Sequence, residues 1–236
     1  MIILCQAVDF LIVKPIIELR YTDNTHNLED KTMETIKNLN INALLAANEL
    51  IDPKEPRDFL RYVCLTQWNG ENVAVATNGH VLGVFKVDGN DSLVKCDFSS
   101  PICVKLGKPP ASLKRMHTVD IEPLGEGKAM LAGSHIVDIM DGSHYPEWQA
   151  VVISAFNTYR TEVEVPGTYN PEYLMKFMKI GKLYGKSSPI IHVAQRGEKA
   201  ALVQIGSIEG FGLIMPIKTH NMALPIWSDA SLNSDK

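Results

Sequence analysis

The stretch that decides the fold is VAVATNGHVLGVFKV, residues 73–87, in which two runs of strand-forming residues flank Thr77-Asn78-Gly79-His80. Val and Phe favour strands, and Asn-Gly between two such runs is typical of a β-hairpin. We predict a type I′ turn, in which Asn78 and Gly79 both take positive φ. A hairpin by itself does not explain His80, so the meaning of that residue depends on the rest of the chain.

Composition predicts a folded globular protein and limits its interactions with nucleic acid. The chain has 236 residues, of which 45% are hydrophobic and 21% charged, as in ordinary globular proteins. Its net charge of −4 argues against coating of nucleic acid by bulk charge. Any contact with DNA is therefore expected to be local.

The cysteines and the apolar N-terminus exclude further classes. No C-x-x-C pair and no histidine at metal spacing accompanies the four cysteines, so we expect buried reduced thiols and neither zinc nor any other cofactor. Residues 1–19 are apolar, but they lack a basic start and contain Asp9 and Lys14. We therefore expect no signal peptide, no membrane contact and a cytoplasmic location. The cysteines are Cys5, Cys64, Cys96 and Cys103.

The order of predicted elements repeats three times, as strand, helix and three strands. The first unit has strands over 33–41, 59–68, 72–78 and 80–88, with a helix over 42–51 capped by Asn42. The second has strands over 101–106, 118–125, 128–134 and 135–142, with a weak helix over 110–116. The third has strands over 161–169, 188–196, 199–206 and 210–218, with a helix over 170–185 capped by Asn170.

Each of these βαβββ units has one helix and cannot cover both faces of its own sheet, so the units must pack against one another. This predicts an α+β fold. Residues 1–34 read as N-terminal strands and a linker, and residues 220–236 read as a tail.

Three separated motifs resemble a known family. ATNGHVL at 76–82 is similar to A-T-D-G-H-R-L, MDGSHYPEWQAVV at 140–152 to D-G-R-F-P-D-Y-R-R-V, and LIMPIK at 213–218 to V-V-M-P-M-R. These motifs occur, in this order, in the bacterial DNA polymerase III beta subunit, the ring-shaped sliding clamp that holds polymerases on DNA. The resemblance implies the DNA clamp fold, with residues 35–152 as a complete domain of two units and 161–219 as a half domain.

In that family the three motifs line a shallow apolar pocket that binds short linear peptides of polymerases and other replication or repair proteins. The resemblance therefore implies a binding protein and not an enzyme. Apolar and methionine side chains suit an adaptable peptide site, and a glycine admits a ligand backbone. The implied pocket residues are Thr77, Gly79, His80, Leu82, Pro146, Val151, Leu213, Met215, Pro216 and Ile217.

The chain also departs from the family pattern. Val81 replaces an arginine and Asn78 replaces an aspartate, so the rim is less charged and the preferred peptides are expected to differ. The family would place another whole unit between Val152 and Thr161, and its first domain has no counterpart before residue 35. Either a shortened or a divergent relative fits these departures.

Basic residues on the predicted helices imply at most weak, sequence-independent contact with double-stranded DNA, because family helices line the DNA channel and few phosphates would be neutralised. A solvated lysine face is the alternative interpretation. The residues concerned are Lys176, Lys179, Lys182, Lys114 and Arg115.

Three alternatives concern the mode of action. The chain could form a processivity ring, as a tetramer of three units each or as a trimer if the N-terminal strands complete a fourth. It could instead be an adaptor or decoy, encoded by a phage or mobile element, that competes for clamp-binding peptides as a monomer or open dimer. The less favoured alternative is a metal-dependent enzyme, since Asp138, Asp141, His144 and Glu147 lie close in sequence.

Overall fold

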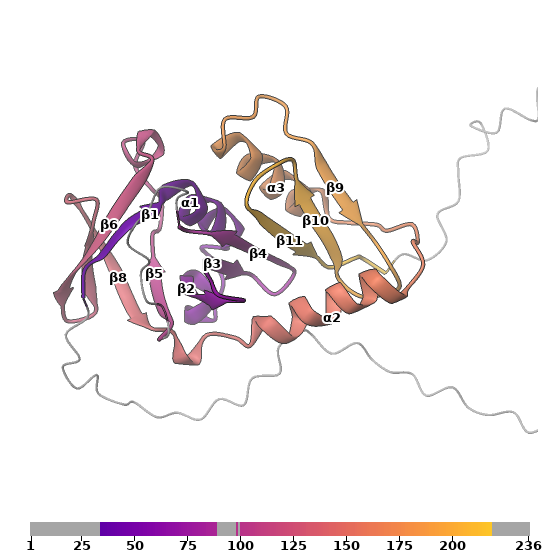
Figure 1. Cartoon of the computed structure of the whole chain (residues 1–236), viewed down its shortest axis with the longest axis horizontal. Helices are drawn as coiled ribbons and strands as arrows, with labels where there is room; N and C mark the ends of the chain where they lie inside the picture. The colour runs from indigo at the N-terminus through magenta and orange to yellow at the C-terminus, as the bar shows by residue number, and fades with distance from the viewer. Residues whose placement is uncertain (1–33, 89–97, 99, 219–236) are drawn as a thin grey trace, which may run out of the picture.

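The computed structural model describes residues 34–88, 98 and 100–218. The strands expected within 1–34 and the tail expected over 220–236 lie outside the described residues, apart from Glu34. The described part forms one antiparallel sheet of eleven strands with three α-helices (Figure 1). The strands follow the order β1-β6-β7-β8-β5-β2-β3-β4-β11-β10-β9.

The elements have the following bounds. The α-helices are α1 (Ile41–Leu50), α2 (Trp148–Thr161) and α3 (Pro171–Leu183), and short 3₁₀ turns are η1 (Asp58–Arg61), η2 (Leu113–Arg115) and η3 (Gly142–His144). The strands are β1 (Ile36–Asn40), β2 (Val63–Trp68), β3 (Glu71–Thr77), β4 (Val81–Lys86), β5 (Ile102–Lys105), β6 (Thr118–Gly125), β7 (Lys128–Leu131), β8 (His135–Asp141), β9 (Ile191–Ala194), β10 (Ala201–Ile205) and β11 (Gly210–Ile214).

Helix α1 is enclosed by the strands of the first two units. Strand β1 pairs with β6, and Leu39 at its end bridges Asp88 beyond β4. The N–H of Asn40 donates to the carbonyl of Val87 at 2.8 Å. The strands thus return on themselves around α1, which lies between β1 and β4 in Figure 1. This explains why α1 is apolar on nearly every side, with seven of its ten residues buried.

The third unit joins the first through strands β4 and β11. Five residue pairs connect them, and Gly83 lies opposite Gly212. A Cβ on Gly212 would lie 2.3 Å from the ring of Phe177, and one on Gly83 would lie 2.4 Å from Leu50. Phe177 of α3 and Leu50 of α1 therefore occupy the space that these glycines leave, which lets the two units share one core.

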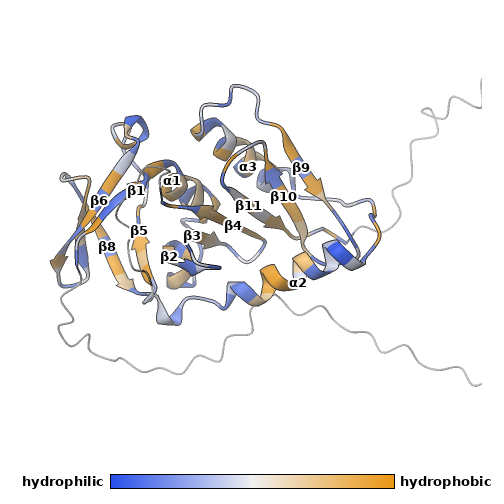
Figure 2. Cartoon of the chain, viewed as in Figure 1, coloured by the Kyte–Doolittle hydropathy of each residue, from blue (hydrophilic) through white to orange (hydrophobic). Residues whose placement is uncertain are grey.

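The helices cover opposite faces of this sheet. Helices α1 and α3 pack on one face, whereas α2 crosses the other (Figure 1). Alternation along β3 serves both layers, since Ala74 and Ala76 face the α1 side and Val73 and Val75 face the α2 side. In Figure 2 the middle of α2 is hydrophobic and its C-terminal end is polar, as expected for a helix lying on a surface.

Two predictions about the units are wrong. The helix expected over 110–116 is only the 3₁₀ turn η2. Two prolines, Pro109 and Pro110, precede it, and a helix this short has too few hydrogen bonds to form without tertiary support. The strand expected over 161–169 is reduced to the bridge between Glu164 and Arg196, and its first residue, Thr161, is the last residue of α2.

The cap of α1 also differs from the prediction. Asn40, not Asn42, is the N-cap, and its side chain accepts the N–H of Asn42 at 3.0 Å. The cap of α3 is as predicted, with Asn170 accepting the N–H of Glu172 at 2.9 Å and Pro171 in the first position. None of the described helices is both long enough and apolar enough to cross a membrane.

The two cysteines within the described residues are free and buried. Cys64 on β2 lies directly opposite Cys103 on β5. A hydrogen bond with Cys64 and burial both raise the pKa of the Cys103 thiol. Both side chains therefore behave as small apolar residues in the layer beneath α2.

Candidate functional site

The hairpin after β3 has a different turn from the one predicted. Gly79 has φ +87°, but Asn78 does not have a positive φ. The N–H of Asn78 donates to the carbonyl of Val81, so the turn is centred on Gly79 and His80. A positive φ at the first central position alone is the pattern of a type II′ turn. The amide oxygen of Asn78 accepts the N–H groups of His80 and Val81, both at 3.0 Å, which explains the asparagine.

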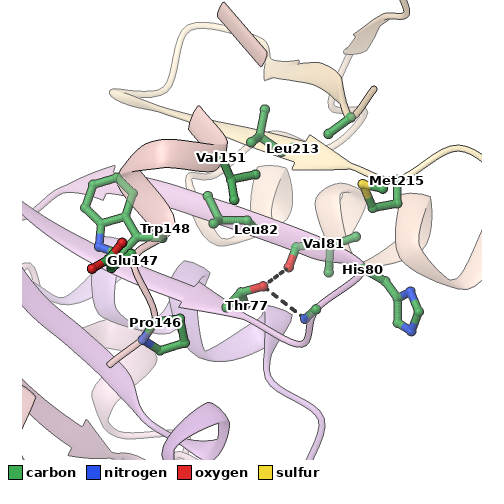
Figure 3. Close-up of a pocket in the computed structure, with 12 residues that line it drawn as sticks. Thr77, His80, Val81, Leu82, Pro146, Glu147, Trp148, Val151, Leu213 and Met215 are labelled. Atoms are coloured by element: carbon green, nitrogen blue, oxygen red, sulfur yellow. Dashed lines mark hydrogen bonds between the residues drawn. The ribbon is translucent and has the colours of Figure 1, made fainter. Parts of the chain in front are cut away.

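The side chain of Thr77 stabilises the hairpin through hydrogen bonds to the backbone of the turn. Its buried hydroxyl donates to the carbonyl of Val81 at 2.8 Å and accepts the N–H of Gly79 at 3.0 Å. Figure 3 shows both hydrogen bonds of Thr77 as dashed lines. The sequence Thr-Asn-Gly is therefore required locally, because each residue satisfies or shapes the backbone of the turn.

The hairpin forms the first wall of the candidate site, and the end of β11 forms the second. Leu213 pairs with Leu82 across the junction of the two units, and the N–H of Met215 donates to the carbonyl of His80 at 2.9 Å. Leu213 is buried and Met215 is half-buried. The third unit thus brings its two apolar side chains directly beside the hairpin.

The start of α2 forms the third wall. Asp141 caps η3 by accepting the N–H of Ser143 at 3.1 Å, and the chain then turns through Tyr145 and Pro146 into the helix. Trp148 is buried with its ring centroid 5.7 Å from that of Trp68, in an edge-to-face arrangement. This contact anchors the first turn of α2 and presents Val151 one turn further on.

These three walls enclose one shallow apolar hollow. Its volume is about 390 Å³, including the part that opens to solvent. Figure 3 shows Val151 and Leu213 on one side and Pro146 and Thr77 on the other. Such a shape suits a short apolar ligand. The hollow is lined by Thr77, Gly79, His80, Val81, Leu82, Pro146, Glu147, Trp148, Val151, Ala200, Leu213 and Met215.

The structure brings eight of the ten predicted pocket residues to this hollow and leaves two outside it. Pro216 and Ile217 follow Met215 but do not line it, and the N–H of Ile217 donates to the carbonyl of Thr168 at 2.7 Å. The lining residues that sequence reasoning missed are Val81, Glu147, Trp148 and Ala200. Val81 and Glu147 are adjacent in sequence to predicted residues and Trp148 lies within the quoted motif 140–152, whereas Ala200 carried no signal in the sequence.

His80 lines the hollow at its edge, and its ring is turned toward α3. The imidazole stacks on Tyr173, with ring centroids 5.6 Å apart and planes 16° apart. Figure 3 shows the ring pointing away from the apolar side chains. His80 therefore contributes its backbone and the side of its ring, while the tyrosine fixes its orientation.

The basic residues predicted to face DNA have different surroundings. Lys176 is directed at the C-terminus of α1, where its ammonium donates to the carbonyls of Glu49 at 2.8 Å and Ile51 at 3.0 Å. Burial there lowers its pKa. Lys179 pairs with the carboxylate of Glu49 at 2.8 Å.

The other basic residues are exposed and have no ion pair with a described residue. The elements that carry them, α3 and η2, both contact α1. These residues are Lys182 on α3, and Lys114 and Arg115 on η2.

The side chains proposed for a metal do not converge. Asp138 pairs with Lys128, and Asp141 accepts from the N–H and hydroxyl of Ser143. His144 is exposed. Within residues 34–88, 98 and 100–218, no group of three or more His, Cys, Asp or Glu side chains could hold a metal ion.

Comparison with known proteins connects this arrangement to solved structures. A DNA polymerase III beta subunit of Borrelia burgdorferi, in complex with a natural product, superposes with a TM-score of 0.52 at 12% identity, over 85% of this chain and 68% of its own. A putative beta subunit of Eubacterium rectale gives 0.53 at 10%, over 84% and 68%. The beta subunit of Thermotoga maritima gives 0.51 at 10%, over 79% of this chain and 65% of its own.

The chain therefore has the DNA clamp fold, as the sequence motifs predicted. These three solved structures are bacterial DNA polymerase III beta subunits, one of them putative. The chain spans about two thirds of the length of these clamps. No protein-family model and no curated protein matches the sequence.

Proposed function

We propose that this chain is a sliding-clamp-like protein that binds short linear peptides of polymerases and other DNA replication or repair proteins in the apolar hollow. The observation that carries the proposal is the convergence of three separated motifs. Segments 77–82, 146–151 and 213–215 lie far apart in sequence, yet residues from all three line one hollow. Motifs that served only as local strands and turns would have no reason to meet at a surface depression.

The chemistry of the lining supports a peptide ligand. Leu82, Val151 and Leu213 offer aliphatic surface, and Met215 adds an adaptable side chain. The hollow is open and shallow, which suits an extended segment with one or two apolar anchors.

Direct binding tests the proposal. The probe is a fluorescein-labelled peptide carrying the clamp-binding segment of a bacterial replicative polymerase, followed by fluorescence anisotropy. Met215→Asp places a charge against the apolar ligand and is expected to weaken binding by about a hundredfold. Met175→Asp is the matched control, because Met175 is 56% exposed on α3 and lies outside the hollow.

A second candidate function is competition for clamp-binding peptides without encirclement of DNA. The specific observation in its favour concerns Lys176 and Lys179, the central lysines of α3. Lys176 is hydrogen-bonded to the end of α1 and Lys179 to Glu49, so their charges are engaged within the chain and not directed at DNA. Light scattering at several concentrations separates the candidates, because one 26.2 kDa chain cannot encircle a duplex. A closed trimer or tetramer supports a processivity ring, whereas a monomer supports the competitor.

A further inference from the structure

Two cysteines face each other where the first unit meets the second. Cys64 on β2 lies directly opposite Cys103 on β5. Both side chains are buried in the layer on the α2 side of the sheet, and both thiols are free. Neither residue lines the hollow, so peptide binding does not account for this pair.

The ladder between β5 and β8 shows which way the backbone of Cys103 points. Opposed residues of two antiparallel strands alternate between hydrogen-bonded and non-hydrogen-bonded pairs. The N–H of Gly142 donates to the carbonyl of Pro101 at 2.9 Å, so this ladder has a hydrogen-bonded pair there. Two residues along β5, Cys103 lies opposite Met140 in the same ladder. Cys103 therefore directs its N–H and carbonyl toward β8 and away from β2.

The hairpin gives the same result for Cys64. The N–H of Asn78 donates to the carbonyl of Val81, so that pair is hydrogen-bonded. Alternation along β3 and β4 then makes the pair of Val75 and Val84 a non-hydrogen-bonded one. Val75 therefore directs its backbone groups toward β2, where it lies opposite Cys64. Cys64 in turn directs its own toward β3 and away from β5.

The two cysteines thus form a non-hydrogen-bonded pair, the kind that brings opposed side chains closest. The Cα atoms of such a pair lie about 4.5 Å apart, within the range of about 4.4–6.8 Å that a disulfide needs. The thiols of Cys64 and Cys103 are also hydrogen-bonded to each other. A bond between the two sulfurs therefore requires no rearrangement of β2 or β5.

Tyr145 lies over this pair. It belongs to the connection from η3 to α2 and to the same buried layer, and its hydroxyl donates to the carbonyl of Val75 at 3.5 Å. Burial raises the pKa of its phenol, and the thiols of Cys64 and Cys103 raise it further, so the phenol lies near both sulfurs. A reagent therefore reaches the thiols only when this connection opens locally.

We propose that Cys64 and Cys103 are an oxidative modification site, at which hydrogen peroxide forms a reversible disulfide within the chain. The thiolate of one cysteine attacks a peroxide oxygen, the O–O bond breaks, and a sulfenic acid and hydroxide are formed. The other sulfur then attacks the sulfenic sulfur, and the hydroxyl group leaves with the thiol proton as water. In total the two thiols lose two electrons and two protons, and the peroxide is reduced to two waters.

The disulfide joins the first unit to the second. It closes residues 64–103 into one loop, which contains the hairpin, and it restricts the unfolded chain more than the folded one. The oxidised chain is therefore more stable than the reduced chain. This inference does not rest on peptide binding.

The test isolates this pair in the full chain. Cys5 and Cys96, which lie outside the described residues, are both replaced by serine. The reduced protein is treated with hydrogen peroxide a few degrees below its unfolding midpoint, where local openings are frequent. We expect the intact mass to fall by two hydrogen atoms and the thermal midpoint to rise by about 5–15 °C. A non-reducing digest should contain the two cysteine peptides linked, and dithiothreitol should reverse every change.

Three further variants in the same background serve as controls. Cys103→Ala should show neither the loss of two hydrogen atoms nor the rise in midpoint. Tyr145→Leu should form the disulfide severalfold faster, because a smaller side chain covers the thiols less completely. Tyr159→Leu, at a position on α2 that is 40% exposed, should leave the rate unchanged. Circular dichroism verifies that each variant folds.

Three results would overturn this inference. They are retention of both thiols after treatment, addition of oxygen without loss of hydrogen, and a disulfide that links two molecules instead of two strands. Equal rates in the Tyr145→Leu and Tyr159→Leu variants would overturn the role of Tyr145 as the cover.

Discussion

The backbone N–H of Met215 donates to the carbonyl of His80 at 2.9 Å, so the end of the third unit is hydrogen-bonded to the hairpin of the first. This contact continues the β4–β11 ladder, which ends at the pair of Val81 and Ile214. The candidate site is therefore built across the junction of two units. Its geometry depends on that junction as much as on the residues that line it.

The hydroxyl of Thr77 is expected to contribute to both stability and binding. Thr77→Val removes the hydrogen bonds to Val81 and Gly79, which leaves the N–H of Gly79 without its acceptor, whereas the carbonyl of Val81 keeps the N–H of Asn78. We expect a loss of roughly 1–3 kcal/mol in the free energy of unfolding, together with weaker peptide binding. Urea denaturation measures the first and anisotropy the second. Thr118→Val, at an exposed strand end, should change neither, and an equally small effect at Thr77 would contradict this account of the turn.

The glycine at the centre of the junction is expected to tolerate no side chain. Gly212→Ala brings a methyl group against the ring of Phe177 and within 3.2 Å of the carbonyl of Leu82. Overpacking of this kind costs about 1–3 kcal/mol. A second substitution, Phe177→Leu, should recover part of that loss in the Gly212→Ala background. Additive losses in the double variant would show that the ring is not the cause.

Glu55 predicts a dependence of stability on acid pH. The hydrogen bond from Arg57 lowers the pKa of this carboxyl in the folded chain below its ordinary value. The stabilisation is therefore present above the unfolded-state pKa and is lost as the pH falls through the folded-state pKa. Glu55→Gln should flatten the acid limb of a plot of unfolding midpoint against pH. Glu198→Gln, at an exposed position, serves as the control and should leave the limb as it is.

The lysines of α3 are expected to have separate roles. Lys176→Met removes two hydrogen bonds to the carbonyls at the end of α1 and should lower the unfolding free energy by about 1–3 kcal/mol without weakening DNA binding. Lys182→Glu should weaken DNA binding and leave the free energy of unfolding unchanged. With only Lys182, Lys114 and Arg115 exposed and without an ion pair among the five predicted basic residues, the slope of log K against log salt should be no steeper than about −3. A steeper slope, measured by anisotropy with a labelled duplex, would contradict this assignment.

Much of the fold was predictable because its signals are local. The alternation of Val and Ala predicts β3, and Asn170-Pro171 predicts the start of α3. Helix α2 was missed although Trp148, Val152 and Ala155, which are buried, have helical spacing. The sequence analysis assigned residues 140–152 only to a family motif and predicted no element between Val152 and Thr161.

The site was partly predictable for a different reason. Three motifs identified most of its residues, but no sequence pattern shows which distant groups meet. The guanidinium of Arg57 lies 3.3 Å from where a Cβ on Gly79 would be, although the two residues are 22 positions apart. The hydrogen bond of Lys176 with Glu49 joins residues 127 positions apart in sequence. It depends on α1 and α3 lying on one face of the sheet.

The most direct test of the central claim is where a bound peptide lies. Methionine methyl groups labelled with ¹³C report this by NMR, since Met215 lines the hollow while Met175 and Met178 are exposed on α3. On titration with the polymerase peptide, the account predicts that the Met215 methyl signal shifts and that the signals of Met175 and Met178 stay in place. Saturable shifts confined to Met175 and Met178, with Met215 unchanged, would contradict it.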